Sequence, residues 1–448
     1  MNLRDALAWL DRHINLEANA GRPNGASLER MREIARVLGD PQKAYPSIHL
    51  TGTNGKGSTA RIATALLGSS GLSVGTYTSP HLERINERMS RNLDPISDEE
   101  LAAAFSAVAA IEPMLDGPPS HFEILTAAAL HWFADIAVDV AVLEVGLLGR
   151  WDCTNIVDAP VAVLTRIAAD HTDRSEGWRR AIAEEKVGIV KPGSTFVLGE
   201  TDPDLRDIFD ASPAAETWVR DEDFGVVGNS LAVGGRLIDM RTPGGSYDDV
   251  FLPLHGAHQA DNAVCALVAV EAFFGRALDA DLVSEAFAEV TVPGRLEPVA
   301  FSPSVLLDAA HNPDGAESLT AALAESFTVV GSRYLVVGML AQQVTEEMLV
   351  ALGAADFDLI VCCTPDSPRA RSAAEVATVA ETLGVATEVV PDPVAAVARA
   401  VSLADEEDLV VVAGSIYVVG AVRAAYSRQA QAQVRREQTD RDRDDEDR

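Results

Sequence analysis

Residues 51–59 read Thr-Gly-Thr-Asn-Gly-Lys-Gly-Ser-Thr; they follow an apolar stretch at 47–50 and precede a helical pattern from Ala60 to Leu67. A strand that runs through a glycine-rich turn into a helix directs backbone N–H groups and the positive end of the helix dipole at an anion. Lys56 adds a mobile positive charge. The stretch therefore predicts a site for the phosphates of ATP. Its expected ligands are Thr53, Asn54, Gly55, Lys56, Gly57 and Ser58.

The stretch departs from the general phosphate-loop pattern at one end, because Leu50 stands where that pattern has glycine. A glycine-rich turn with only a structural role is the alternative. The strand before the turn and the helix after it favour the nucleotide site.

The composition is that of a globular protein with more than one domain. The chain has 448 residues, 47% of them hydrophobic and 23% charged, so two domains are expected. Its formal net charge is −32, to which the tail from Arg435 to Arg448 contributes little, since acids and arginines nearly balance there. An acidic body argues against nucleic acid or an anionic membrane surface as a partner.

Neither a secretion signal nor a membrane segment is expected. The first residues alternate charged and apolar types, and the longest uncharged apolar stretch, 409–422, is shorter than the ~18 residues of a membrane helix. The cysteines form no CxxC pair and read as reduced thiols, which predicts a cytoplasmic protein. They are Cys153, Cys265, Cys362 and Cys363.

Lysine is rare in this chain, and its few positions are informative. Of 36 basic residues only four are lysine: Lys43, Lys56, Lys186 and Lys191. Positions that keep lysine where arginine has replaced it elsewhere are candidates for chemistry that a guanidinium cannot perform. Lys56 lies in the phosphate loop, which leaves Lys186 as the second candidate. The alternative is that these four lysines remain by chance and have no special role.

The first domain, expected over residues 1–295, reads as strands alternating with helices. Helices are expected at 3–13, 28–38, 98–111, 122–134, 259–274 and 280–289, and strands at 47–50, 73–77, 138–143 and 161–167. Continuous apolar runs such as 138–143 are typical of buried parallel strands. Between about 195 and 255 Gly and Asp are more frequent, which predicts a small antiparallel segment.

A second α/β alternation follows the junction at Pro293-Gly294-Arg295. Strands are expected at 305–307, 334–337, 359–363, 386–390 and 409–412, which predicts a Rossmann-like domain over 296–426. It has no GxGxxG and so is not read as a dinucleotide binder. Residues 427–448 are expected to be a disordered charged tail. The predicted fold class is α/β: a phosphate-loop domain with a predominantly parallel sheet, then a Rossmann-like domain.

Polar residues stand at the ends of three predicted strands of the first domain. Ser79 follows the strand at 73–77, Glu144 ends the strand at 138–143, and His171 follows the strand at 161–167. Ligands of α/β proteins bind at the carboxyl edge of the sheet, and a carboxylate beside a phosphate loop suits Mg²⁺. The alternatives are that Glu144 is a solvated residue at a strand end and that 78–82 is an ordinary polar loop with a proline turn. For His171, the objection is that histidine is an unusual ligand for an ion as hard as Mg²⁺.

These motifs together resemble the folylpolyglutamate synthase/dihydrofolate synthase family, the folate branch of the Mur-type ATP-dependent amide ligases. The resemblance runs in order from about residue 1 to residue 425. It rests on residues 51–59, 79–82, 86–88, 144–146, 152–155, 170–172, 293–297, 308–313 and 367–369. It implies a Mur-ligase-type ATP domain followed by a glutamate-ligase domain.

The resemblance also implies a reaction. A carboxylate of folate or dihydropteroate attacks the γ-phosphate of ATP, and the amine of L-glutamate displaces phosphate from the resulting acyl phosphate. ATP and one or two Mg²⁺ ions are the implied cofactors, and a monomer that closes about its interdomain hinge is expected. Ser79, Glu144 and His171 would carry Mg²⁺, and Lys186 matches a family lysine that can be carbamylated.

Further residues take roles by the same resemblance. Asn262, Arg295 and Asp308 map to contacts with adenine, γ-phosphate and ribose. His311 maps to the region that receives glutamate. The substrate-side residues are Phe122, Glu123, Arg150 and Asp152.

Two positions depart from the family pattern. Leu148 stands in the turn after Glu144 where the family has glycine, and a side chain there restricts backbone conformations with positive φ and crowds the pterin. Gln342-Gln343-Val344 replaces Asp-Lys-Asp after 338–341, which puts a second-domain contact in doubt. Two alternatives to an active folate ligase therefore stay open: a nucleotide-binding paralogue with weak or lost activity, and a Mur-type ligase for another acceptor. The sequence does not decide between dihydrofolate synthesis, polyglutamylation or both.

Overall fold

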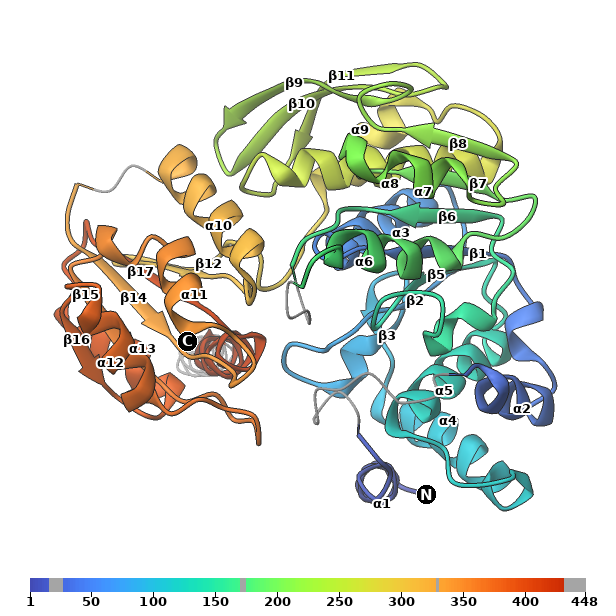
Figure 1. The fold of residues 1–448 in the computed structure, drawn as a ribbon, viewed down its shortest axis with the longest axis horizontal. Coiled ribbons are helices and arrows are strands. Elements are labelled where there is room, and N and C mark those ends of the chain that lie inside the picture. The colour runs from blue at the N-terminus through green and yellow to red at the C-terminus, as the bar shows by residue number, and fades with distance from the viewer. Residues whose placement is uncertain (16–26, 170–174, 328–329, 431–448) are drawn as a thin grey trace, which may run out of the picture. The chain divides into compact units, whose positions relative to one another are not determined.

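The computed structural model describes residues 1–15, 27–169, 175–327 and 330–430. The chain divides into two compact units, Met1–Val292 and Pro293–Arg448 (Figure 1). The junction predicted at 293–295 thus opens the second unit.

Unit 1 is built on an eight-stranded sheet of order β4-β3-β2-β5-β1-β6-β7-β8. The six strands from β2 to β8 in this order are parallel, whereas β3 and β4 pair antiparallel at one edge. The strands are β1 (Ser47–Thr51), β2 (Val74–Tyr77), β3 (Met89–Arg91), β4 (Asp94–Pro95), β5 (Val140–Glu144), β6 (Val161–Leu164), β7 (Thr195–Leu198) and β8 (Glu216–Val219).

Helices cover both faces of this sheet, which is why its central strands are apolar on both sides (Figure 1). In β5, Val140 and Val142 join one core while Ala141 and Leu143 join the other. The first core includes α3 (Lys56–Ser69), α8 (His258–Phe274) and α9 (Ala280–Ala288). The second includes α1 (Leu3–Leu10), α2 (Glu29–Val37), α4 (Asp98–Ile111) and α5 (His121–Asp135). The helices α6 (Trp178–Lys186) and α7 (Arg206–Asp210) pack near β7.

The segment between 195 and 255 is only partly the antiparallel piece that the sequence predicts. Its first two strands, β7 and β8, extend the parallel sheet, so the prediction is wrong for them. The antiparallel sheet itself is confirmed over β9 (Gly225–Ala232), β10 (Gly235–Arg241) and β11 (Ser246–Leu252). One face of this small sheet joins the core of α8 and α9 through Ile238 and Met240.

Unit 2 carries a six-stranded sheet of order β12-β13-β17-β14-β15-β16. The predicted five strands are present and parallel: β13 (Ser304–Leu307), β14 (Arg333–Val337), β15 (Leu359–Cys362), β16 (Thr387–Val389) and β17 (Leu409–Ala413). The sequence did not predict β12 (Glu297–Phe301), which pairs antiparallel with β13 at the edge. The helices are α10 (Pro313–Ser326), α11 (Thr345–Ala351), α12 (Ala373–Thr382) and α13 (Pro393–Leu403).

A last helix runs over residues 416–430. It includes residues 427–430, which the sequence analysis assigned to a disordered tail; the rest of that tail lies outside the described residues. None of the helices in the described ranges is long and apolar enough to cross a membrane.

Candidate active site

The phosphate loop joins β1 to α3 at the carboxyl edge of the unit 1 sheet. Gly55 caps α3 in the left-handed region, with φ at 87°, and its carbonyl accepts the Thr59 N–H at 2.9 Å. The segment after β6 holds the loop from the other side: Thr165 Oγ1 donates to Asn54 O at 2.6 Å, and Thr53 N donates to Arg166 O at 2.6 Å. These bonds fix the loop before any ligand binds.

Two glycines of the loop are in close contact with predicted site residues. A methyl group at Gly55 would lie 2.3 Å from Asn262 Oδ1, so the amide of α8 packs directly on the loop. A methyl group at Gly57 would lie 3.6 Å from Glu144 Oε2. Asn262 is buried and donates from Nδ2 to Gln259 at 3.0 Å. A side chain at position 57 would therefore contact the Glu144 carboxylate.

Glu144, Lys56 and Ser79 come together beside the loop, as the strand-end rule predicts. Lys56 Nζ lies 3.9 Å from Glu144 Oε1, and Ser79 N donates to Glu144 Oε2 at 3.3 Å. Glu144 is only 4% exposed. Lys56 Nζ also donates to Thr53 O at 3.2 Å.

This donor set fits a hard divalent cation, because a buried carboxylate and a serine hydroxyl supply oxygen ligands next to a phosphate loop. The third expected ligand, His171, lies outside the described residues. Among the residues that are described, no group of three or more His, Cys, Asp or Glu side chains could hold a metal ion.

Lys186 ends α6 and is buried, at 4% exposure. Its Nζ donates to Gly52 O at 2.7 Å, so the second candidate lysine touches the segment that leads into the phosphate loop. The two lysines that the sequence analysis singles out therefore reach the same loop from α3 and from α6.

The loop from Gly146 to Arg150 follows Glu144 and contacts α6. Arg150 N donates to Glu185 O at 2.8 Å, and a methyl group at Gly149 would lie within 3.0 Å of Lys186 backbone atoms. Leu148 occupies the left-handed region, with φ at 60°, which favours glycine. The predicted conflict at this position is thus present as backbone strain.

Three of the four predicted substrate-side residues, Phe122, Arg150 and Asp152, lie in or beside this loop. The Phe122 ring covers Gly146, since a methyl group there would lie 2.3 Å from Phe122 Cζ. Arg150 Nη2 donates to Glu184 O at 3.0 Å. Asp152 is buried and accepts the N–H groups of Leu147 at 2.9 Å and Thr154 at 3.0 Å. Burial raises the pKa of Asp152, while these hydrogen bonds oppose the rise.

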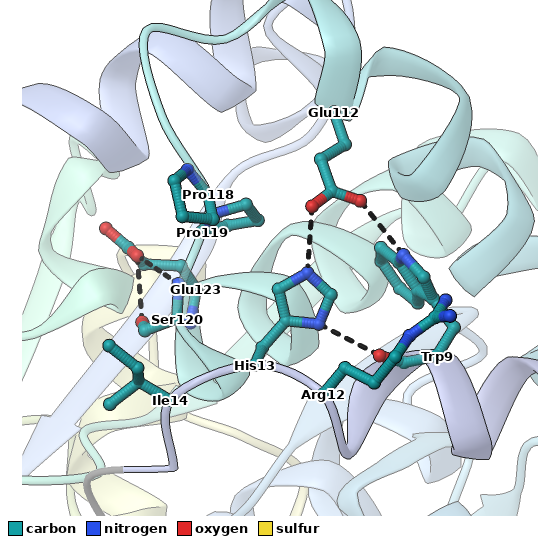
Figure 2. Close-up of a pocket in the computed structure, with 9 residues that line it drawn as sticks. All are labelled: Trp9, Arg12, His13, Ile14, Glu112, Pro118, Pro119, Ser120 and Glu123. Atoms are coloured by element: carbon teal, nitrogen blue, oxygen red, sulfur yellow. Dashed lines mark hydrogen bonds and ion pairs between the residues drawn. The ribbon is translucent and has the colours of Figure 1, made fainter.

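Glu123 lies away from this loop and lines a cavity of about 430 Å³ (Figure 2). Its carboxylate accepts the Ser120 N–H at 2.7 Å and the Ser120 hydroxyl at 2.8 Å, which caps α5. Opposite, His13 Nε2 lies 3.0 Å from Glu112 Oε1, and Trp9 donates to the same carboxylate at 2.9 Å. Neither Phe122 nor Gly146 lines this cavity.

In unit 2 the predicted residues follow the carboxyl edge of its sheet. Asp308 accepts the N–H groups of Leu296 at 2.9 Å and Ala310 at 2.8 Å, so it fastens the junction to the end of β13. His311 Nδ1 faces Ala309 O at 2.9 Å. Arg295 lies in the junction turn, partly exposed.

Gln343, which belongs to the one departure that lies in unit 2, has a clear structural role. Its amide donates to His311 O at 2.6 Å and to Gly414 O at 3.0 Å, and its Oε1 accepts the Leu340 N–H at 2.5 Å. It therefore joins three loops at the sheet edge through backbone groups alone.

Sequence reasoning missed two residues that shape the unit 1 site. Thr165 donates to the phosphate loop at Asn54 O, and Gln259 accepts from Asn262. Asn155, part of the motif at 152–155, donates to Arg150 O at 2.9 Å and so holds the Gly146–Arg150 loop. The sequence carries no signal for Thr165, which lies inside the predicted strand at 161–167, or for Gln259, whose contact depends on tertiary packing.

Known proteins match both units. Residues 50–270 match the Mur ligase middle domain, and residues 294–416 match the glutamate ligase domain of Mur ligases. The dihydrofolate synthase/folylpolyglutamate synthase of Mycobacterium tuberculosis is 39% identical over 90% of this chain and 91% of its own.

Solved structures agree. The Mycobacterium tuberculosis folylpolyglutamate synthase complexed with ADP superimposes with a TM-score of 0.89 at 37% identity, over 95% of this chain and 98% of that one. A bifunctional folylpolyglutamate synthase/dihydrofolate synthase with Mn, AMPPNP and L-glutamate bound gives 0.83 at 31% identity, over 95% and 98%. The fold, the phosphate loop and these matches define an ATP-dependent ligase of the Mur type. Within that class, the chain belongs to the folylpolyglutamate synthase/dihydrofolate synthase family.

Proposed function

We propose that this chain attaches L-glutamate to the carboxylate of a reduced folate, of dihydropteroate, or of both, using ATP. The observation that carries the proposal is that Lys56 and the buried Glu144 meet beside the glycine-rich turn that starts α3. A phosphate and a cation bound there would meet the helix dipole, a positive charge and a carboxylate. ADP, AMPPNP and L-glutamate are bound in the related structures.

The proposed reaction has two steps. A carboxylate oxygen of the acceptor attacks the γ-phosphorus of ATP, and ADP leaves, giving an acyl phosphate. The amine of glutamate attacks the acyl carbon, loses a proton, and expels inorganic phosphate with that oxygen. Residues 53–58 orient the phosphates, and Lys56 offsets their charge.

Ser79 and Glu144, with His171, would hold Mg²⁺, which supplies charge neutralisation at the phosphates when bound. Lys186 is proposed to act as its carbamate beside this site. Its retention as lysine and its burial at Gly52 support that role.

The remaining roles follow family membership. We assign Asn262 to adenine, Arg295 to the γ-phosphate, Asp308 to ribose and His311 to glutamate. Phe122, Glu123, Arg150 and Asp152 are assigned to the acceptor side, with Phe122 as a wall for the pterin and Asp152 as support for its loop. The bonds of Asp152 to the loop favour support over direct contact.

Small molecules are the proposed partners, and a monomer in the cytoplasm is the proposed state. The described cysteines form no disulfide, which supports a reducing compartment. Domain bounds of 1–295 and 296–426 stay a prediction; the last described helix, 416–430, continues past residue 426.

Phosphate release tests the proposal. The purified chain is assayed with ATP, Mg²⁺ and glutamate, with dihydropteroate, tetrahydrofolate or no acceptor. Stimulation by either pterin is expected, and the pterin that stimulates identifies the activity. Release that no pterin stimulates would overturn the proposal and favour a paralogue without ligase activity or a ligase for another acceptor.

A further inference from the structure

A histidine is buried in the middle of β1, the strand that leads into the phosphate loop. His49 is 0% exposed, between Ile48 and Leu50 in a strand whose other interior positions are apolar. Burying an imidazole costs free energy unless it is hydrogen-bonded. Nε2 of His49 lies 2.8 Å from Thr154 Oγ1, and no described residue partners its Nδ1. An apolar side chain would avoid that cost, so we looked for a role of the hydrogen bond between His49 and Thr154.

The bond from His49 continues as a directed chain. The Thr154 hydroxyl donates to Asp152 Oδ1, so it accepts the Nε2–H of His49. The other oxygen of Asp152 accepts the Leu147 N–H at 2.9 Å. Thr154 is fully buried in the short helix η4 (Cys153–Ile156). The chain therefore runs from β1 through η4 to the loop Gly146–Arg150.

A second contact from the same face of β1 holds the same loop. Residues 49 and 51 point to one side of the strand because side chains alternate. Thr51 Oγ1 donates to Leu148 O at 2.6 Å. Leu148 is the residue with positive φ, so the loop is held in a conformation that a non-glycine residue disfavours. Strand β1 thus holds the loop in two ways: directly at the Leu148 carbonyl through Thr51, and indirectly at the Leu147 N–H through His49, Thr154 and Asp152.

The loop lies between two groups that the proposed reaction uses. Gly146 lies under the Phe122 ring, and Gly149 packs on the backbone of Lys186. A shift of the loop would move the surface beside Phe122, whereas the phosphate loop has its own bonds to Thr165 and Arg166. Displacement should therefore affect the acceptor more than ATP.

We propose that His49, Thr154 and Asp152 form a positioning relay that sets the Gly146–Arg150 loop for the pterin acceptor. The relay touches no reacting atom. This inference rests on the proposed function, but part of its test does not depend on activity.

The test compares Thr154→Val, which removes the hydroxyl at constant shape, with Thr154→Ser, which keeps it. Steady-state kinetics on the full chain give KM for the pterin and for ATP. Thr154→Val removes the hydroxyl's bonds to both His49 and Asp152, so we expect the pterin KM to rise about tenfold, with the ATP KM within about twofold. Thr154→Ser should stay within about twofold of wild type in both.

Cys153 provides the readout without activity. It lies between Asp152 and Thr154 and is partly exposed, whereas the other three cysteines are buried with raised thiol pKa values. Its labelling rate with a disulfide reagent, assigned with Cys153→Ser, should rise about tenfold in Thr154→Val and not in Thr154→Ser. Should Thr154→Val not fold, His49→Leu replaces it, with the same direction expected in both readouts.

Equal behaviour of the Val and Ser variants, or parallel rises of both KM values, would overturn the relay. A wild-type protein that no pterin stimulates would defeat the proposed function, while the labelling comparison would still decide whether the relay holds the loop.

Discussion

Replacing Gly57 by alanine separates the fold of the phosphate loop from its function. Gly57 is the second residue of α3, and the added methyl group would lie 3.6 Å from Glu144 Oε2, an ordinary contact distance. The fold should therefore tolerate it. Alanine is the better helix former, so the free energy of unfolding should be unchanged or rise by up to ~1 kcal/mol.

The same methyl group would contact the Glu144 carboxylate, which is proposed to hold the cation beside the ATP phosphates. We expect kcat/KM for ATP to fall about 100-fold, which corresponds to ~2.7 kcal/mol of transition-state stabilisation. Gly68→Ala is the matched control, since Gly68 lies in the same helix and its added methyl group would meet no atom within 4 Å. Pterin-stimulated phosphate release and urea unfolding measure the two quantities. A stable Gly57→Ala protein with kcat/KM within twofold of wild type would refute this reasoning.

Three further predictions concern the same unit. Gly55→Ala should destabilise unit 1 by about 2–4 kcal/mol in urea unfolding, because the residue has positive φ and its methyl group would lie 2.3 Å from Asn262; an unchanged midpoint would contradict this. Lys186→Arg should abolish phosphate release while unfolding stays cooperative, since a guanidinium does not form a stable carbamate; a fully active variant rejects the carbamate. Burial, aided by Lys191, lowers the pKa of His49 to about 3, below its unfolded value of about 6.5, so the unfolded chain binds the extra proton between these values. The stability that this group contributes is thus present above pH ~6.5 and is lost as the pH falls toward ~3. Between these two pH values, His49→Gln should reduce the slope of the unfolding free energy against pH by up to ~1.4 kcal/mol per pH unit. An unchanged slope would show that His49 does not titrate in this way.

The sequence predicted the strands of both sheets where apolar runs are continuous. The run at 138–143 became β5, and the five strands predicted in unit 2 are all present. The sequence-based prediction was wrong for β7 and β8. These short strands lie in a Gly- and Asp-rich segment, and their parallel pairing depends on contacts with residues far away in the sequence. The prediction missed β12, where Pro298 interrupts the pattern; an edge strand tolerates proline.

For the site, the strand-end rule predicted that Ser79 and Glu144 lie beside Lys56, because parallel strands meet at one edge. It could not predict the grip of β1 on the Gly146–Arg150 loop. His49 read as part of an apolar strand, and Thr154 lies over one hundred residues away in the chain. The role of Gln343 was equally hidden, since its partners are backbone groups of three separate loops.

The central claim is that the acceptor carboxylate is activated by the γ-phosphate of ATP. The direct measurement uses an acceptor whose carboxylate oxygens are ¹⁸O, with unlabelled ATP and glutamate. The account predicts that each glutamylated product forms with one ¹⁸O in the inorganic phosphate released. Glutamylated product accompanied by unlabelled phosphate, or by ¹⁸O in AMP, would contradict it.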